Sequence, residues 1–190
     1  MTKFKLLTCL LLLFSGYVMA IEEPSYTVLE DANPFELRAY ASQIIAETEV
    51  SGDLDAASSA GFRLIADYIF GNNKAFAGGS EKISMTVPVT MAKTNGKWRM
   101  HFVMPKQYTL TTLPQPNNAE VSLRAVPKRH VAVIRFSWFA GEKKVAQKTA
   151  ELLAWMKSRK LTPIGQPTLA RYNPPWTPPF VRRNEVMILY

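Results

Sequence analysis

A weak internal repeat constrains the fold of this chain more than any other feature of its sequence. Residues 35–53, FELRAYASQIIAETEVSGD, are matched about 86 residues later by residues 121–142, VSLRAVPKRHVAVIRFSWFAGE. Both copies carry Leu-Arg-Ala, a break, an apolar strand and an acidic helix start. A duplication of this kind predicts two similar halves, each containing strands and one helix.

Two segments have helical periodicity. The first runs from Leu54 to Phe70, with Asp53 as its N-cap and Gly71 as its stop, and Gly61 on its apolar face permits close packing. The second runs from Glu142 to Arg159. Eight further segments, rich in alternating, β-branched or aromatic residues, are expected to be strands: Phe35–Tyr40, Gln43–Val50, Ile83–Met91, Lys97–Met104, Glu120–Val126, His130–Trp138, Thr168–Tyr172 and Asn184–Leu189. This order predicts a pseudo-two-fold α+β domain in which two helices pack on antiparallel strands.

The first twenty residues have the features of a secretory signal peptide. Lys3 and Lys5 precede a short apolar run, and a small-residue cleavage site ends at Ala20. We therefore expect a signal peptide at 1–20 and a single domain at 21–190 without a membrane span, with a retained anchor as the alternative. Cleavage would remove Cys9, the one cysteine of the chain, and export without disulfides favours a bacterial periplasm.

The charge of the chain favours acidic partners. Removing Lys3 and Lys5 lowers the formal net charge from +8 to +6, which suits propionates, phosphates or anionic lipid. The basic residues are scattered and form no nucleic-acid motif, so we expect no nucleic-acid partner.

No pattern of catalytic or metal-binding residues stands out. Neither His101 nor His130 has a second histidine or a carboxylate at ligand spacing. The chain contains no Gly-x-Ser-x-Gly elbow, and its paired carboxylates have the setting of solvated charges. We therefore expect neither an enzyme nor a metal site built from side chains alone. Four methionines in the central strands indicate either ordinary core or a soft apolar cavity: Met85, Met91, Met100 and Met104.

The last twenty residues contain a stiff apolar loop between two predicted strands. Proline fixes φ and removes backbone donors, so the loop can hold a flat apolar surface toward a flat ligand at little entropic cost. Arg171, Arg182 and Arg183 lie beside it and suit carboxylates or aromatic faces. The alternative is a rigid hairpin whose aromatics cap the protein's own core. The loop interleaves prolines with aromatics: Pro174, Pro175, Trp176, Pro178, Pro179 and Phe180.

Several segments together resemble the SOUL haem-binding family, in the family's order and over about residues 26–190. They are Phe35-Glu-Leu-Arg-Ala-Tyr40, the helix Ala60–Phe70 with Gly71-Asn72-Asn73, Ile83-Ser-Met-Thr-Val-Pro-Val-Thr90, and Arg171-Tyr-Asn-Pro-Pro175 through Arg182-Arg-Asn-Glu-Val186. The resemblance implies a distorted antiparallel β-barrel of two pseudo-symmetric halves with two α-helices.

The resemblance also implies a shallow apolar groove for haem or a related tetrapyrrole, between the first helix and the last hairpin loop. Its helix side would be Phe62, Ile65, Ala66 and Ile69, and its loop side Tyr172, Pro174, Pro175, Trp176, Pro178 and Phe180. Some members place an axial histidine where this chain has Ala39, and Ser59 and Thr177 replace basic residues that meet the propionates in a relative. Propionates would then be held by Arg63, Arg171, Arg182 or Arg183.

The resulting expectation is non-enzymatic binding of haem or a porphyrin, held by apolar contact and arginine–propionate pairs, with no axial ligand at position 39. The alternative is that the groove binds another apolar ligand or a partner protein in the cell envelope.

Overall fold

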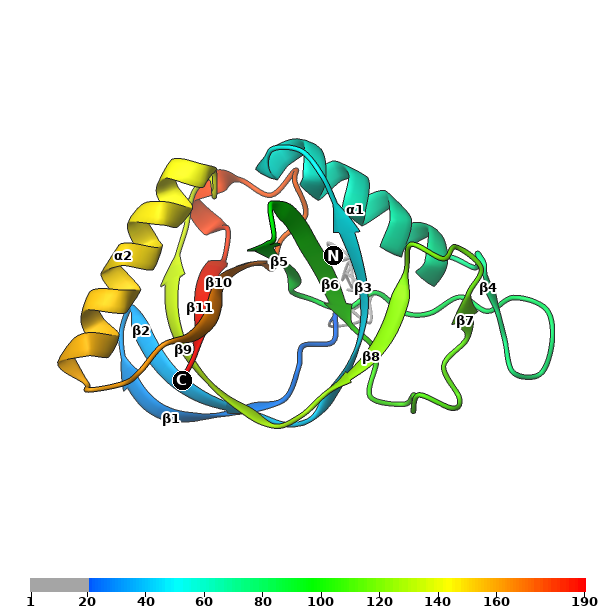
Figure 1. Cartoon of the computed structure of the whole chain (residues 1–190), viewed down its shortest axis with the longest axis horizontal. Coiled ribbons are helices and arrows are strands. Elements are labelled where there is room, and N and C mark those ends of the chain that lie inside the picture. Colours follow the sequence, from blue (N-terminus) through cyan, green and yellow to red (C-terminus); the bar gives the residue numbers. More distant parts are fainter. Residues whose placement is uncertain (1–20) are drawn as a thin grey trace, which may run out of the picture.

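The structure, a computed structural model, describes residues 21–190 and consists of one nine-stranded antiparallel sheet with two helices, together with a small two-stranded sheet (Figure 1). The expected signal peptide lies outside the described residues. The elements are β1 (Tyr26–Ala32), β2 (Phe35–Tyr40), β3 (Gln43–Val50), α1 (Leu54–Ile69), β4 (Asn73–Lys74), β5 (Val89–Thr94), β6 (Lys97–Val103), β7 (Gln115–Pro116), β8 (Ser122–Val126), β9 (Arg129–Phe136), α2 (Glu142–Ser158), β10 (Ile164–Arg171), the 3-10 turn η1 (Pro179–Val181) and β11 (Asn184–Leu189).

The strand order of the large sheet reflects the duplication seen in the sequence. The order is β1-β2-β9-β11-β10-β5-β6-β3-β8. Four strands of the first half have counterparts in the second half: β2 corresponds to β8, β3 to β9, β5 to β10 and β6 to β11. When each strand is replaced by its counterpart, the part of the order from β2 to β8 is the same order read backwards. The helices obey the same exchange, because α1 contacts β3 and β6 whereas α2 contacts β9 and β11. The chain therefore has two halves of equivalent topology, to which β1 is added as an extra edge strand.

Both predicted helices are confirmed. The Asp53 carboxylate caps α1 by accepting hydrogen bonds from the backbone N–H groups of Asp55 and Ala56. Gly61 lies against Met100 of β6, where an added Cβ would come within 3.1 Å of the methionine sulfur. Its lack of a side chain therefore lets α1 approach the sheet closely. None of the helices in residues 21–190 has the length and apolar character needed to cross a membrane.

Most predicted strands are confirmed over most of their length. β10 begins four residues earlier than expected, at Ile164, β9 ends two residues earlier, at Phe136, and the short β4 and β7 were not expected. Two further segments differ. β1 is absent from the sequence-based expectation because most of its side chains are exposed and give no apolar alternation. The predicted strand Ile83–Met91 is wrong in its first six residues, since β5 begins only at Val89. Pro88 has no N–H to donate to a sheet, and the Thr86 hydroxyl instead donates to the carbonyl of Val103.

The main core lies between the helices and the sheet. Met91 and Met100 are buried within it as ordinary core residues, Met85 packs against it, and Met104 is buried in it and also lines a pocket at the end of β6. The sheet curls so that the β2–β3 and β8–β9 segments run together from one half to the other (Figure 1). Within residues 21–190 no strand pairing joins β8 to β1. The α+β class is thus confirmed, whereas closure into a barrel stays a prediction.

A buried ion pair occupies the face of the sheet opposite the helices. Phe35 of β2 stacks on Trp155 of α2, so Arg38, three residues further along the strand, points to the other face. Arg38 and Glu185 of β11 lie on either side of β9, and their side chains are only 1% and 0% exposed. Two parallel hydrogen bonds of 2.8 and 2.9 Å join the guanidinium to the carboxylate.

Further polar groups from β2 complete the arginine's contacts. The Glu36 carboxylate accepts a hydrogen bond from Arg38 Nε at 2.7 Å, and the Tyr40 hydroxyl accepts one from Nη1 at 3.1 Å. The Tyr26 ring lies 4.4 Å from the guanidinium carbon. Such complete pairing is what a buried arginine requires, because an unpaired buried charge costs several kcal/mol.

The Glu185 carboxylate also holds both ends of the tail loop, residues 172–183, which connects β10 to β11. The Tyr172 hydroxyl donates to Glu185 Oε2 at 2.7 Å, and Arg183 Nε donates to Oε1 at 2.9 Å. The backbone N–H of Tyr172 also donates to the carbonyl of Arg183 at 3.2 Å. The ion pair therefore fixes the base of the tail loop to the middle of the sheet.

We expect Arg38→Met to lower the free energy of unfolding by about 3–5 kcal/mol, because the substitution leaves the Glu185 charge buried without its main partner. Urea unfolding of the purified protein measures this loss. The matched control is Arg99→Met, which breaks an exposed pair with Glu49 and should cost within about 1 kcal/mol. Equal losses of unfolding free energy in the two variants would contradict the structural role given to the buried Arg38–Glu185 pair.

The ion pair also predicts a pH dependence. Burial alone would raise the pKa of Glu185, but the hydrogen bonds and charge of Arg38 outweigh it and hold that pKa below its ordinary value of 4.5. Stability from this group is therefore fully present above pH 4.5 and is lost as the pH falls through the lowered pKa. The difference in unfolding free energy between the wild type and Glu185→Gln should shrink on acidification below pH 4.5. A difference that stays constant from pH 7 to pH 3 would exclude this linkage.

Candidate functional site

The tail loop is folded around the side chain of Arg182. Arg182 Nε donates to the carbonyl of Thr177 at 2.8 Å, and Nη2 donates to the carbonyl of Pro175. The Asn173 side chain accepts a hydrogen bond from the backbone N–H of Arg183 at 2.6 Å. These contacts, together with the prolines, give the loop a defined shape although its apolar side chains face solvent. Its exposed large apolar side chains are Trp176 (83% exposed), Phe180 (65%) and Val181 (56%).

A second loop, residues 137–141 between β9 and α2, lies directly against the tail loop. The N–H of Trp138 donates to the carbonyl of Pro179 at 2.8 Å, and the Asn184 amide donates to the carbonyl of Trp138 at 2.9 Å. The Arg182 guanidinium carbon lies 5.0 Å from the centre of the Phe139 ring. Trp138 and Phe139 are 58% and 62% exposed. The two loops together carry five exposed large apolar side chains, named here the aromatic ledge: Trp138, Phe139, Trp176, Phe180 and Val181.

Sequence reasoning missed the contribution of Trp138 and Phe139 to this ledge. Trp138 was expected to end a strand, but β9 stops at Phe136 and Trp138 has a φ of 74°. A non-glycine residue with positive φ is uncommon and is retained where surrounding contacts impose it, often at functional sites. The available signal was two consecutive aromatics just before Ala-Gly and the start of α2, where alternation of a strand breaks down.

The predicted helix side of the groove is only partly presented to solvent. Phe62 is 38% exposed, and its ring lies 5.7 Å from that of Phe102 in the sheet below. Ile65, Ala66 and Ile69 are buried, and the two isoleucines belong to the main core. Phe62 is therefore the one of these four residues that α1 offers to a ligand at its surface.

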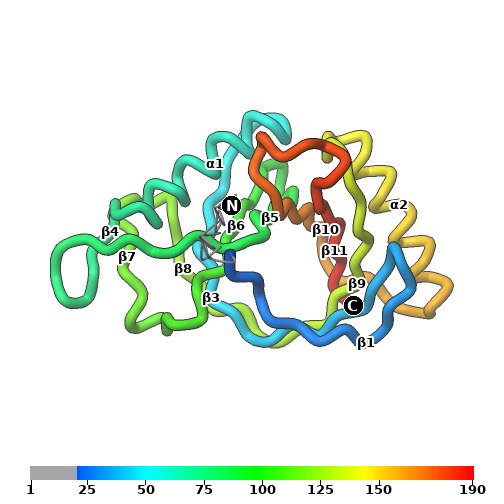
Figure 2. The backbone as a smooth tube through the Cα atoms, turned by 180° about the vertical axis from the view of Figure 1, so that it is seen from behind, coloured from blue at the N-terminus to red at the C-terminus, as the bar shows by residue number. Residues whose placement is uncertain are grey.

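Arg171 joins α1 to the second loop. Its Nη1 donates to the Ser58 hydroxyl on α1 at 2.9 Å, and its Nη2 donates to the carbonyl of Ala140 at 3.1 Å. Burial lowers the pKa of Arg171. The backbone N–H of Leu54, at the start of α1, donates to the Glu142 carboxylate at the start of α2. Figures 1 and 2 accordingly show the tail loop lying between the first turns of the two helices.

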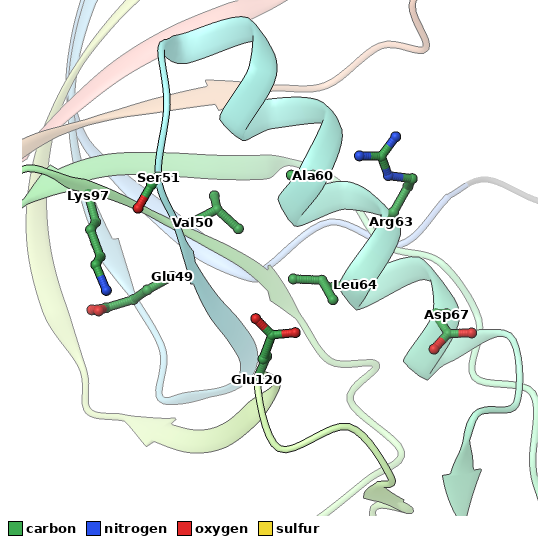
Figure 3. Close-up of a pocket in the computed structure, with 9 residues that line it drawn as sticks. All are labelled: Glu49, Val50, Ser51, Ala60, Arg63, Leu64, Asp67, Lys97 and Glu120. Carbon is green, nitrogen blue, oxygen red and sulfur yellow. The ribbon is translucent and has the colours of Figure 1, made fainter.

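Arg63 lies in a different place from the other predicted arginines. It lines a mixed-charge pocket of about 630 Å³ between the other flank of α1 and the end of β3 (Figure 3). The pocket contains three carboxylates, from Glu49, Asp67 and Glu120. Of the four predicted arginines, Arg182 and Arg171 lie at the ledge. Arg183 lies beneath the tail loop, where it pairs with Glu185 and Glu23. Arg63 does not lie at the ledge.

The remaining loop-side residues take two kinds of position. Tyr172 is buried at the base of the loop, where it bonds to Glu185. Pro174 is half-buried, whereas Pro175 and Pro178 are exposed. The prolines thus shape the outer part of the loop, and Tyr172 anchors it.

Both histidines lie away from the ledge. Phe102 faces α1, so its neighbour His101 points to the opposite face of the sheet. Burial, reinforced by the charge of Arg129, lowers the pKa of His101 to about 4, and the ring is therefore neutral at pH 7. His130, at the start of β9, stacks on Tyr190. In residues 21–190 no three His, Cys, Asp or Glu side chains are grouped so as to hold a metal ion.

Comparisons with solved structures show the fold at low sequence identity. The C-terminal domain of EcmrR shares 9% identity over 86% of this chain and 96% of its own length, with a TM-score of 0.63. An uncharacterized conserved protein and a hydrolase, both from Listeria innocua, each share 11% identity over 81% of this chain and 90% of theirs, with TM-scores of 0.59 and 0.57. At these identities the likeness concerns the fold alone.

A search among curated proteins finds no match. The family comparison is specific, because the model of the SOUL heme-binding protein matches residues 21–189. That span includes both of the segments joined by the Arg38–Glu185 pair and the whole tail loop. The chain is a member of the SOUL heme-binding protein family.

Proposed function

We propose that this protein binds haem or a related tetrapyrrole without catalysing its conversion, with the ring lying on the aromatic ledge beside Phe62 of α1. The observation that carries the proposal is the concentration of five exposed large apolar side chains on two loops that hydrogen-bond to each other. Exposed apolar surface gathered in one place marks an interaction site far more than scattered single residues do. Membership of a heme-binding family supports a tetrapyrrole as the ligand.

The ledge is suited to a flat apolar ring. Aromatic side chains contribute large contact areas with few rotatable bonds, and the loop backbone is already held by hydrogen bonds. Burying roughly 400–600 Å² of apolar surface is worth about 10–15 kcal/mol at about 25 cal/mol per Å². Association costs of several kcal/mol reduce this value toward the roughly 8 kcal/mol of a micromolar complex. Micromolar binding therefore requires no bond to iron.

Arg182 is the best placed partner for a propionate. Two of its nitrogens donate to carbonyls of the tail loop, and no hydrogen bond from Nη1 is found in the described part of the chain. Its guanidinium also lies over the Phe139 ring, within the ledge. Arg171 is close by but is engaged by Ser58 and Ala140. A propionate at Arg182 would orient the ring, which the apolar contacts alone would leave free to rotate.

The iron of haem would gain no ligand from position 39 in this arrangement. Ala39 lies within β2 and pairs with Thr27 and His130 of the neighbouring strands. The iron chemistry would come from the haem itself, and the residues of the chain would bind and orient the ring. We therefore propose that the iron-free ring binds about as tightly as haem.

A second candidate function uses the same ledge for another apolar ligand or a partner protein in the cell envelope. The exposure of Trp176, at 83%, favours it, because such a side chain is also a typical anchor at protein interfaces. Native mass spectrometry of protein purified from its own host separates the two functions, since a co-purified tetrapyrrole supports the first and a co-purified lipid or peptide the second.

The place of action is also proposed. The charged start, apolar run and small-residue site of residues 1–20 favour export, and the absence of cysteine from residues 21–190 favours a bacterial periplasm.

Titration with haemin and, separately, with protoporphyrin tests the proposed function. We expect a shift of the Soret band with micromolar affinity for both rings, and a loss of about tenfold or more for both in Trp176→Ala, because a central aromatic anchor is removed. Phe76→Ala is the matched control, since Phe76 is 90% exposed on a loop outside the ledge.

Absence of binding at tens of micromolar for both rings would refute the proposal. Equal losses for Trp176→Ala and Phe76→Ala would remove the ledge as the site.

A further inference from the structure

Contacts between the two loops that carry the aromatic ledge bring its side chains together. The Trp138 N–H donates to the carbonyl that precedes Phe180. The Arg182 guanidinium lies 5.0 Å from the Phe139 ring and donates to the carbonyls on either side of Trp176. The tail loop lies between the first turns of the two helices (Figures 1 and 2). The ledge is therefore one apolar surface near the point where both helices begin.

Aromatic side chains on a stiff loop suit the surface of a bilayer. The indole ring combines a large apolar body with a polar N–H, and aromatic residues are enriched where lipid meets water. Four of the five ledge residues are aromatic, and Trp176 and Phe180 are 83% and 65% exposed. The prolines already restrict the backbone of the tail loop, so contact with lipid would order little further chain.

The charged residues beside the ledge are mostly basic and complement an anionic surface. The tail loop, the second loop and the first turn of α2 contain four basic residues and one acidic residue, Glu142. The Glu142 carboxylate accepts a hydrogen bond from the backbone N–H of Leu54. In the described part of the chain, no carboxylate lies within 4.0 Å of Arg182, Lys143 or Lys144. Near an anionic bilayer, each such cation raises the affinity about fivefold.

The start of the described chain lies close to the base of the tail loop. Arg183 Nη1 donates to both oxygens of the Glu23 carboxylate, at 3.2 and 3.1 Å. Ala20, the last residue of the expected signal peptide, precedes Glu23 by three residues, which span at most about 10 Å. A chain still attached to a bilayer through residues 1–20, as a precursor or by a retained anchor, would therefore hold the base of the tail loop near that bilayer.

We propose that the ledge docks on the surface of a bilayer containing anionic lipid. Its aromatic side chains lie at the level of the headgroups, and Arg182, Lys143 and Lys144 face lipid phosphates. The unpaired cations and the position of the chain start favour a bilayer over a partner protein. The inference uses the ledge of the proposed function, but it does not depend on a tetrapyrrole as the ligand.

Flotation of the processed chain, residues 21–190, with lipid vesicles tests the proposal. This chain contains every described element of the fold and lacks the apolar run of residues 1–20. We expect binding to phosphatidylcholine vesicles that contain about one quarter phosphatidylglycerol, and at least about tenfold weaker binding to phosphatidylcholine alone. Brominated lipids in the same vesicles should quench tryptophan fluorescence, because Trp138 and Trp176 contact the bilayer.

A double variant removes two of the apolar contacts. Trp176→Ser with Phe180→Ser should weaken binding to the anionic vesicles at least about tenfold, since binding scales with the apolar area buried in the interface. Both side chains are mostly exposed, so the change leaves the core intact. Phe70→Ser with Phe76→Ser is the matched control, at sites 57% and 90% exposed outside the ledge, and should bind as the wild type does.

A second double variant removes charge. Lys143→Gln with Lys144→Gln should weaken binding about tenfold, because two cations leave the bilayer surface. Lys157→Gln with Lys160→Gln lowers the net charge equally at the other end of α2 and should lose less than about threefold.

Haemin titration without lipid separates this inference from the proposed function. Haemin binding without vesicle binding overturns membrane docking alone, whereas vesicle binding without haemin binding supports docking and refutes the tetrapyrrole. Equal affinity for the two kinds of vesicle, unquenched tryptophan fluorescence, or equal losses in a double variant and its control also overturn docking.

Discussion

The buried pair of Arg38 and Glu185 is the interaction on which the arrangement of this protein depends. It joins β2 to β11 across β9, and therefore ties the first strand of one half to the last strand of the other. Glu185 also receives Tyr172 and Arg183, the two ends of the tail loop. One carboxylate thus links the middle of the sheet to the position of the loop. An apolar pair of similar size could be as stable, but it could not accept hydrogen bonds from four donors, two on β2 and two in the tail loop.

This network gives a physical meaning to two of the segments by which the chain resembles the family. Glu36, Arg38 and Tyr40 come from Phe-Glu-Leu-Arg-Ala-Tyr, and Tyr172, Arg183 and Glu185 come from the two ends of the tail segment. They support the tail loop from below and are buried or half-buried. The exposed side chains of the ledge are a separate set. These segments of the family resemblance therefore hold the loop in place and do not supply its exposed surface.

Local physics explains which parts of the fold could be predicted from the sequence. The helix α1 was predictable because Asp53 caps it and Gly61 marks its packed face. The tail loop was predictable from its prolines. Trp138 and Phe139 were not, because their exposure depends on hydrogen bonds to Pro179 and Asn184, more than forty residues away in the sequence.

The roles of the arginines could not be predicted either, because the sequence does not show which groups each charged side chain contacts in the fold. Arg183 supports the loop through Glu185, Arg182 holds the loop carbonyls, and Arg63 lies on the other flank of α1 (Figure 3). A pocket between the start of β3 and the end of β6 was not foreseen either, since it is assembled from four separate stretches of chain whose residues show no common pattern.

Paramagnetic NMR locates the tetrapyrrole most directly. Spectra of the protein with haemin, compared with zinc protoporphyrin as the diamagnetic reference, report which residues lie near the iron. Binding on the ledge predicts line broadening of the indole signals of Trp138 and Trp176 and of the amide of Phe180, with Phe76 unaffected. Broadening centred on Ile44 and Leu110, or on none of these residues, would contradict the ledge as the site of the ring.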